Sequence, residues 1–126
     1  MSTVLIIDDD STIQDVAEAI LTRKGYTILK ALDTVQAEEF LSSMPIDLIL
    51  LDIVLPGQGG LEYLMDLRKR YSSISVIIMS GKVRTDLSPV KKLVQQFGAE
   101  CILSKPFTAE ELTNAVNAAV KKRYNQ

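Results

Sequence analysis

The residues best suited to chemistry in this sequence are polar side chains that each follow an apolar run. They are Asp8, Asp9 and Asp10, then Asp52, Ser80 and Lys105. Carboxylates brought close together repel one another, and at about 4 Å a like-charged pair costs about 1 kcal/mol in water and several times more at a partly buried site. A hard divalent cation such as Mg²⁺ removes that cost, and an ammonium group can neutralise a phosphoryl oxygen as a point charge. The set predicts a metal site suited to phosphate chemistry, provided that folding brings these residues together.

Most of these residues also have a simpler explanation. Acids after Val4–Ile7 favour the dipole at the start of a helix, which is sufficient to account for Asp10. Ser residues at strand ends usually cap turns, and a Lys in a loop is usually solvated. Asp52 does not fit this explanation, because it stands directly after the apolar run Leu48–Leu51. The prediction of a site therefore rests on the ordered occurrence of the whole set.

Five short apolar runs alternate with longer segments of helical period. The runs are Val4–Ile7, Tyr26–Leu29, Leu48–Leu51, Val76–Met79 and Cys101–Leu103. Unbroken rather than alternating hydrophobicity predicts strands that are covered on both faces, as in a parallel sheet. The second run is the most polar of the five, which places it nearest an edge.

The segments between the runs carry helix signals. The first helix has a capping box of Ser11 and Gln14 and an apolar stripe of Ile13, Val16, Ala17, Ile20 and Leu21, and the second, Val35–Leu41, is capped by Asp33. The third is marked by Leu61, Leu64 and Met65, and the fourth starts at Ser88-Pro89, has the stripe Val90, Leu93, Val94 and Phe97, and stops at Gly98. The last has a capping box of Thr108 and Glu111 before the stripe Leu112 to Val120. Together with the apolar runs they give five β-α units.

Five β-α units in 126 residues predict an α/β fold with a doubly wound, five-stranded parallel sheet in the order 2-1-3-4-5, a flavodoxin-like arrangement. Residues 1–126 are expected to form a single domain. In such sheets the site lies beyond the carboxyl ends of the strands, at the switch between strands one and three. The acids after the first and third runs stand at that switch.

Composition limits the classes of function. The formal net charge is −2, so no basic field indicates direct binding to nucleic acid or membrane. The chain has no histidine, which excludes histidine catalysis and a phosphohistidine within this chain. The first apolar run is too short for a signal peptide or a membrane span. We therefore expect a cytoplasmic protein whose phosphoryl donor, if it has one, is another molecule.

The ordered set of motifs resembles the receiver domain of bacterial two-component response regulators. The motifs are Asp8-Asp9, Asp52 followed by Pro56 and Gly60, Ser80-Gly81, and Lys105-Pro106-Phe107. Each motif is weak alone, but the set in this order on five β-α units is specific. The resemblance extends from Val4 to the last helix.

The resemblance implies roles for individual residues. Asp52 is the phospho-acceptor, and Asp8, Asp9, Asp52 and the backbone carbonyl of Val54 bind Mg²⁺. Ser80 and Lys105 bind the phosphoryl group, and the bond before Pro106 is often cis in this family. The implied partners are a histidine kinase or histidine phosphotransfer protein, and either a downstream protein target or an effector domain absent from this chain. A phosphorylation-dependent homodimer is compatible with these roles, and no turnover enzyme is implied.

Three features depart from the family pattern. Ile102 stands where the family usually has Tyr or Phe, the segment Gly81 to Pro89 is slightly longer than usual, and no effector domain follows. The first departure keeps open a receiver-like module retained only for binding or dimerisation. A phosphatase of the haloacid dehalogenase type is disfavoured, because it needs a second Asp at the position of Val54 and a nucleophile after the first strand. A flavin mononucleotide carrier is disfavoured, because acids at Asp8 to Asp10 would repel its phosphate.

Overall fold

The computed structural model describes residues 2–55, 57–81, 92 and 95–124. The strands are β1 (Thr3–Ile7), β2 (Thr27–Ala31), β3 (Leu48–Asp52), β4 (Ser75–Ser80) and β5 (Cys101–Ser104), and the helices are α1 (Ser11–Thr22), α2 (Thr34–Ser43), α3 (Gly60–Arg70) and α5 (Ala109–Tyr124). All strand pairs are parallel, and the order is β2-β1-β3-β4-β5. The predicted doubly wound sheet and its strand order are confirmed, and the most polar strand lies at an edge.

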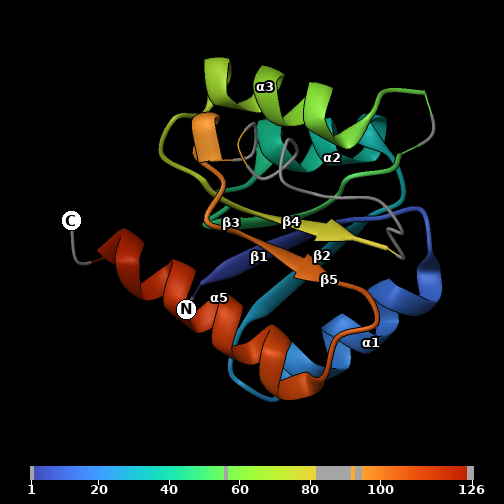
Figure 1. Ribbon diagram of the computed structural model, residues 1–126, viewed down its shortest axis with the longest axis vertical. Helices are drawn as coiled ribbons and strands as arrows, with labels where there is room; N and C mark the ends of the chain where they lie inside the picture. Colours follow the sequence, from blue (N-terminus) through green and yellow to red (C-terminus); the bar gives the residue numbers. More distant parts are fainter. Residues whose placement is uncertain (1, 56, 82–91, 93–94, 125–126) are drawn as a thin grey trace.

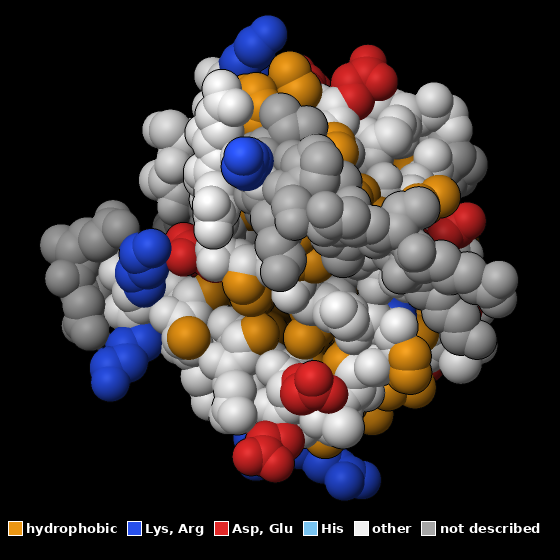
Figure 2. All heavy atoms as spheres, viewed as in Figure 1, with side chains coloured by type: hydrophobic (Ala, Val, Ile, Leu, Met, Phe, Trp, Pro, Cys, Tyr) orange, Lys and Arg blue, Asp and Glu red, His pale blue; other side chains and the backbone are white. Residues whose placement is uncertain are grey.

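Helices cover both faces of the sheet (Figure 1). Helices α1 and α5 pack on one face, and α2 and α3 pack on the other. Successive side chains of a strand point to opposite faces, so Val4 and Ile6 join the core under α1 and α5 while Leu5 and Ile7 join the core under α2 and α3. The exposed residues Lys121 and Lys122 lie in the C-terminal part of α5, where basic side chains stand out from the surface (Figure 2). Within the described part of the chain, none of the helices combines the length and apolar character needed to cross a membrane.

The register of the central strands brings the acids together. Ile7 of β1 pairs with Leu51 of β3, so Asp8 and Asp52, which follow them, are neighbours across the two strands. Each of these acids stands two residues after a side chain of the α1 and α5 core, Ile6 or Leu50. The period of two therefore directs both carboxylates to the same side of the sheet.

The start of α1 differs from the prediction. The cap is Asp10, whose carboxylate accepts hydrogen bonds from the backbone N–H groups of Thr12 and Ile13. The Ser11 and Gln14 capping box is therefore wrong, because Gln14 turns inward and is 4% exposed. The predicted apolar stripe is also too wide, since Val16 is 44% exposed. A carboxylate one residue earlier caps this helix, which frees Gln14 for a buried position.

Other helix signals are confirmed. Asp33 caps α2 by accepting a hydrogen bond from the N–H of Gln36. Thr108 and Glu111 form the predicted capping box, each side chain accepting from the other residue's N–H, at 2.9 and 3.0 Å. The predicted helix after Ser88-Pro89 falls largely on 82–91, 93 and 94, outside the described residues.

Candidate functional site

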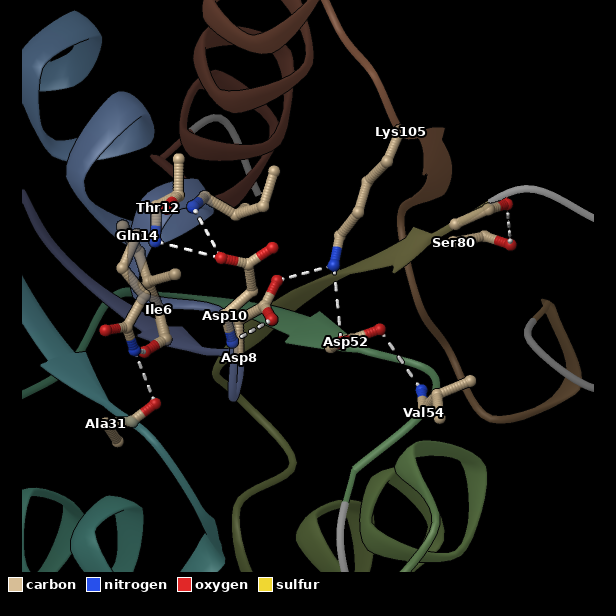
Figure 3. A network of polar contacts seen from close by, with 12 residues as sticks. Ile6, Asp8, Asp10, Thr12, Gln14, Ala31, Asp52, Val54, Ser80 and Lys105 are labelled. Atoms are coloured by element: carbon tan, nitrogen blue, oxygen red, sulfur yellow. Dashed lines mark hydrogen bonds and ion pairs between the residues drawn. The ribbon is translucent and has the colours of Figure 1, made fainter.

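Three of the predicted acids converge at the carboxyl ends of β1 and β3. Carboxylate oxygens of Asp8, Asp9 and Asp52 all lie within 4.8 Å of one another. Asp8 is fully buried and Asp52 is 6% exposed, whereas Asp9 is exposed. Figure 3 shows Asp8 and Asp52 side by side beneath the end of the Lys105 side chain. The sequence prediction that these acids meet is therefore confirmed for the described residues.

The loop that carries Asp8 is held by its own hydrogen bonds. The N–H of Asp8 donates to the carbonyl of Ala31 at 3.1 Å, and Oδ1 of Asp8 accepts from the N–H of Asp10 at 2.9 Å. The Asp10 carboxylate is turned toward the first turn of α1, where it accepts from Thr12. The simpler explanation given for Asp10 thus holds, and the cluster consists of Asp8, Asp9 and Asp52.

Lys105 is the cation of the site. Its Nζ lies 2.6 Å from Oδ2 of Asp8 and 3.3 Å from Oδ2 of Asp52. The backbone places it there: its N–H donates to the carbonyl of Ser80 at 2.7 Å, directly after the last paired residues of β4 and β5. The Lys105–Pro106 bond is cis, as the resemblance implied. Lys105 follows β5, which is separated from β1 by β3 and β4, and its side chain therefore reaches back across the sheet to both acids.

Burial and neighbouring charges shift the pKa values of Asp8 and Lys105. Burial raises the pKa of Asp8; the hydrogen bond from Lys105 lowers it, and the charge of Asp52 raises it further, with a net upward shift. For Lys105, burial lowers the pKa, but the hydrogen bond and charge of Asp8 and the charge of Asp52 outweigh it, so the net direction is upward. The raised pKa of Lys105 reflects the two carboxylates beside its single ammonium group, whereas the raised pKa of Asp8 is mainly an effect of burial. Such a site would be stabilised electrostatically by a further cation.

Asp52 is fixed by the turn that follows it. Its Oδ1 accepts a hydrogen bond from the N–H of Val54 at 3.1 Å. The backbone of Asp52 is also covered by Gly60, the first residue of α3: a β-carbon at Gly60 would lie 2.2 Å from the Asp52 carbonyl oxygen. The sequence shows a glycine at this position but not the close approach of the two backbones. Gly60 is therefore a residue of the site that pattern reasoning understated.

Ser80 lies at the same rim but does not contact the acids. It is the last residue of β4 and is 1% exposed, and its hydroxyl donates only to the carbonyl of Gly81, at 3.4 Å, among the contacts of the described residues. Figure 3 shows it beyond Asp52, on the side of Lys105 away from Asp8. The structure thus brings together Asp8, Asp9, Asp52 and Lys105, and leaves Ser80 nearby.

The donor set suits a hard divalent cation. All three side chains offer carboxylate oxygens, which Mg²⁺ prefers over nitrogen or sulfur. Two of them are buried in a place where uncompensated charge is costly. Val54 stands two residues after Asp52 in the chain, and its side chain is 72% exposed. On chemistry and burial, the residues present fit a magnesium ion.

Comparison with known proteins gives a consistent result. A sequence model of the response regulator receiver domain matches residues 4–117. A response regulator receiver domain protein from Clostridium thermocellum is 29% identical with a TM-score of 0.88, covering 99% of this chain and 98% of that one. A CheY-like receiver domain protein from Methanospirillum hungatei JF-1 has the same fold, at 23% identity, a TM-score of 0.89, and coverages of 99% and 98%. NtrX from Brucella abortus is 25% identical with a TM-score of 0.90, covering 98% of this chain but 28% of NtrX.

Proposed function

Because the chain belongs to the response regulator receiver domain family, we propose that it accepts a phosphoryl group on Asp52 from a histidine kinase or a histidine phosphotransfer protein. The observation that carries this proposal is the cluster at the carboxyl rim, where the buried Asp52 lies beside two further acids and one ammonium group. The product is an acyl phosphate on Asp52. Its formation switches a surface that other proteins recognise.

Asp52 supplies the nucleophile. A carboxylate oxygen of Asp52 attacks phosphorus in line with the bond to the donor imidazole nitrogen. The new oxygen–phosphorus bond forms as the nitrogen–phosphorus bond breaks, and its electron pair stays on the imidazole. Phosphoryl transfer requires mainly positioning and neutralisation of charge on the equatorial oxygens. The Val54 N–H, which binds one carboxylate oxygen of Asp52, supplies positioning of this kind.

Asp8, Asp9, Asp52 and the backbone carbonyl of Val54 would hold Mg²⁺ in this proposal. When bound, the ion supplies positive charge to the phosphoryl oxygens and offsets the mutual repulsion of the acids. The support for this assignment is the oxygen-only donor set within 4.8 Å and the burial of two of its members.

Lys105 and Ser80 bind the transferred group. Lys105 lies 3.3 Å from Oδ2 of Asp52, so its ammonium group is already within reach of a phosphoryl group built on that residue. Ser80 ends the adjacent strand, and a modest movement of its hydroxyl away from Gly81 would let it donate to a phosphoryl oxygen. Phosphorylation brings up to two negative charges to this rim, which is a sufficient cause for such a movement.

The output is expected to be a protein contact. The partner is a separate downstream target or an effector domain in the same polypeptide, and a phosphorylation-dependent homodimer is a second form of the same output. The similar segment of NtrX is part of a longer chain. We expect the protein to act in the cytoplasm, where a kinase can reach it.

The experiment is intact-mass spectrometry after incubation with acetyl phosphate and Mg²⁺, and with a cognate kinase. One phosphoryl adduct is expected in the wild type, and none in Asp52→Asn or when Mg²⁺ is chelated. Asp66→Asn is a matched control, because Asp66 is a partly exposed acid on α3 whose partner is Arg70. An adduct that persists in Asp52→Asn would show that the acceptor is wrong.

A receiver-like binding module without phosphorylation is the second candidate. The observation in its favour is Ile102, a partly buried aliphatic residue packed against the core under α2 and α3. An aliphatic side chain cannot report on Ser80 through rotation of an aromatic ring. A wild type without adduct under both donors would select this candidate.

A further inference from the structure

Gln14 is a buried polar residue beside the acid cluster with no part in the roles described so far. It lies in the second turn of α1 and is 4% exposed. Its Nε2 donates to the carbonyl of Ala31 at 2.6 Å and, more weakly, to the carbonyl of Ile6 at 3.5 Å. Figure 3 shows this amide directed down from α1 to the end of β2. The side chain therefore bridges the helix and the ends of two strands.

This bridge spans the loop that carries the acids. Ile6 precedes Asp8 and Asp9 in the chain, and Gln14 follows them, so the contact joins the two ends of a segment of nine residues. At the same point, the carbonyl of Ala31 accepts a second hydrogen bond, from the N–H of Asp8 at 3.1 Å. The carbonyl oxygen of Ala31 thus accepts one hydrogen bond from α1 and one from the start of the acidic loop.

Asp9 depends on this support more than the other acids. Asp8 is held by Lys105 and by the N–H of Asp10, and Asp52 by the N–H of Val54. Within the described residues, the Asp9 carboxylate has no hydrogen bond or ion pair, and the side chain is exposed. Its place in the cluster is therefore set by the backbone between β1 and α1, which is the backbone that Gln14 brackets.

We propose that Gln14 is a positioning residue for the metal-binding carboxylates, acting by fixing α1 against the ends of β1 and β2. This inference rests on the proposed function, since it concerns the same magnesium site. Gln14 touches none of the three carboxylates, so it does not bind the ion. It holds the two ends of the Asp8–Asp10 loop at the separation at which the carboxylates converge.

A positioning role predicts a specific pattern of metal binding. Mg²⁺ demands near-ideal octahedral geometry, whereas Ca²⁺ accepts flexible coordination. Loss of positioning should therefore weaken Mg²⁺ more than Ca²⁺, whereas loss of negative charge would weaken both. Removal of groups that orient metal ligands typically costs about 10- to 100-fold in affinity.

The test is isothermal titration calorimetry with MgCl₂ and with CaCl₂ on the full chain. Gln14→Met keeps the length of the side chain and removes the amide, and Gln14→Leu is prepared alongside it in case the first variant does not fold. Leu21→Val is the matched control, because Leu21 is a fully buried residue of the same helix with no polar contact to the loop. Circular dichroism and urea unfolding record the fold and stability of each variant.

For Gln14→Met, we expect the Kd for Mg²⁺ to rise about 10-fold or more, the Kd for Ca²⁺ to rise by a smaller factor, and both constants to stay at wild-type values in Leu21→Val. Wild-type Mg²⁺ affinity in a folded Gln14 variant overturns the inference and leaves the proposed function intact. Equal weakening of both ions, or the same loss in Leu21→Val, also overturns it, because either result indicates general loosening of the fold. A wild type that binds no Mg²⁺ contradicts the proposed metal site itself.

Discussion

A single methyl group at Gly60 should displace the end of β3, which carries the proposed phospho-acceptor Asp52. Gly60 begins α3 and is buried against the backbone of the residues that end and follow β3. A β-carbon there would lie 2.2 Å from the carbonyl oxygen of Asp52 and 2.6 Å from Cα of Ile53. Both neighbours are backbone atoms in or next to a central strand, so neither can rotate away as a side chain could. Either α3 or the Asp52 backbone must move.

The size of the effect follows from these distances. Ordinary carbon contacts begin near 3.4 Å, so the two backbones must separate by about 1 Å. Overpacking of this kind costs about 1–3 kcal/mol in the free energy of unfolding. A misplacement of about 1 Å in a reacting group can slow the reaction by about 10²-fold. We therefore expect Gly60→Ala to fold with reduced stability and to form the Asp52 phosphoryl adduct about 10²-fold more slowly at equal acetyl phosphate.

Gly59→Ala is the matched control for this prediction. Gly59 has an ordinary φ of −64°, and a β-carbon there meets no atom within 4 Å. As the residue that caps α3, it should lose less than about 1 kcal/mol on substitution and leave the rate of adduct formation unchanged. Urea unfolding gives the stabilities, and a time course of intact mass gives the rates. Equal adduct rates in the two variants would refute the role assigned to Gly60.

Two further predictions concern the packing of α3. Arg68 donates to the carbonyl oxygens of Phe97 and Gly98 ahead of β5, so Arg68→Met should cost about 2–3 kcal/mol in the free energy of unfolding by urea. Arg70→Met removes the partly exposed ion pairs with Glu38 and Asp66 and should cost less than about 1 kcal/mol. The reverse ranking would contradict this assignment. The hydrogen bond from Arg70 lowers the pKa of Glu38 below its ordinary 4.5, so the Glu38 carboxylate stabilises the fold above that pH and ceases to do so as the pH falls through the folded pKa. Glu38→Gln should therefore reduce the fall in Tm on acidification. The same dependence of Tm on pH in the two proteins would count against this prediction.

The sequence was sufficient for the sheet because its signals are local and redundant. Unbroken apolar runs indicate strands covered on both faces, and right-handed crossovers leave few strand orders. The position of the acids then follows from where each run ends. Asp8 and Asp52 meet because Ile7 and Leu51 pair in register. The Thr108 and Glu111 capping box could also be predicted from the sequence, since both of its hydrogen bonds lie within four residues.

The remaining features depend on directions that spacing does not encode. Asp10 and Ser11 are both good caps, and the choice between them depends on where Gln14 points, toward a carbonyl 17 residues away in β2. A helical period identifies a stripe but not the width of its buried part, so Val16 was wrongly placed in the core. Gly60 requires knowledge of how closely α3 approaches β3. These are properties of packing between elements rather than of any one segment.

The distances around Lys105 indicate where a response to phosphorylation would begin. Lys105 forms ion pairs with two carboxylates, and its Nζ lies closer to Asp8 than to Asp52, at 2.6 against 3.3 Å. If Asp52 accepts a phosphoryl group as proposed, a single carboxylate charge is replaced by up to two charges on the phosphoryl oxygens. The stronger pull then lies on the Asp52 side, and Lys105 should shift from Asp8 toward it. Lys105 is joined through Pro106 to Phe107, which packs against the core under α1 and α5. Ile102 packs on the opposite face of the sheet, so we expect the contacts of the connection from β5 to α5 to change first if Asp52 is phosphorylated.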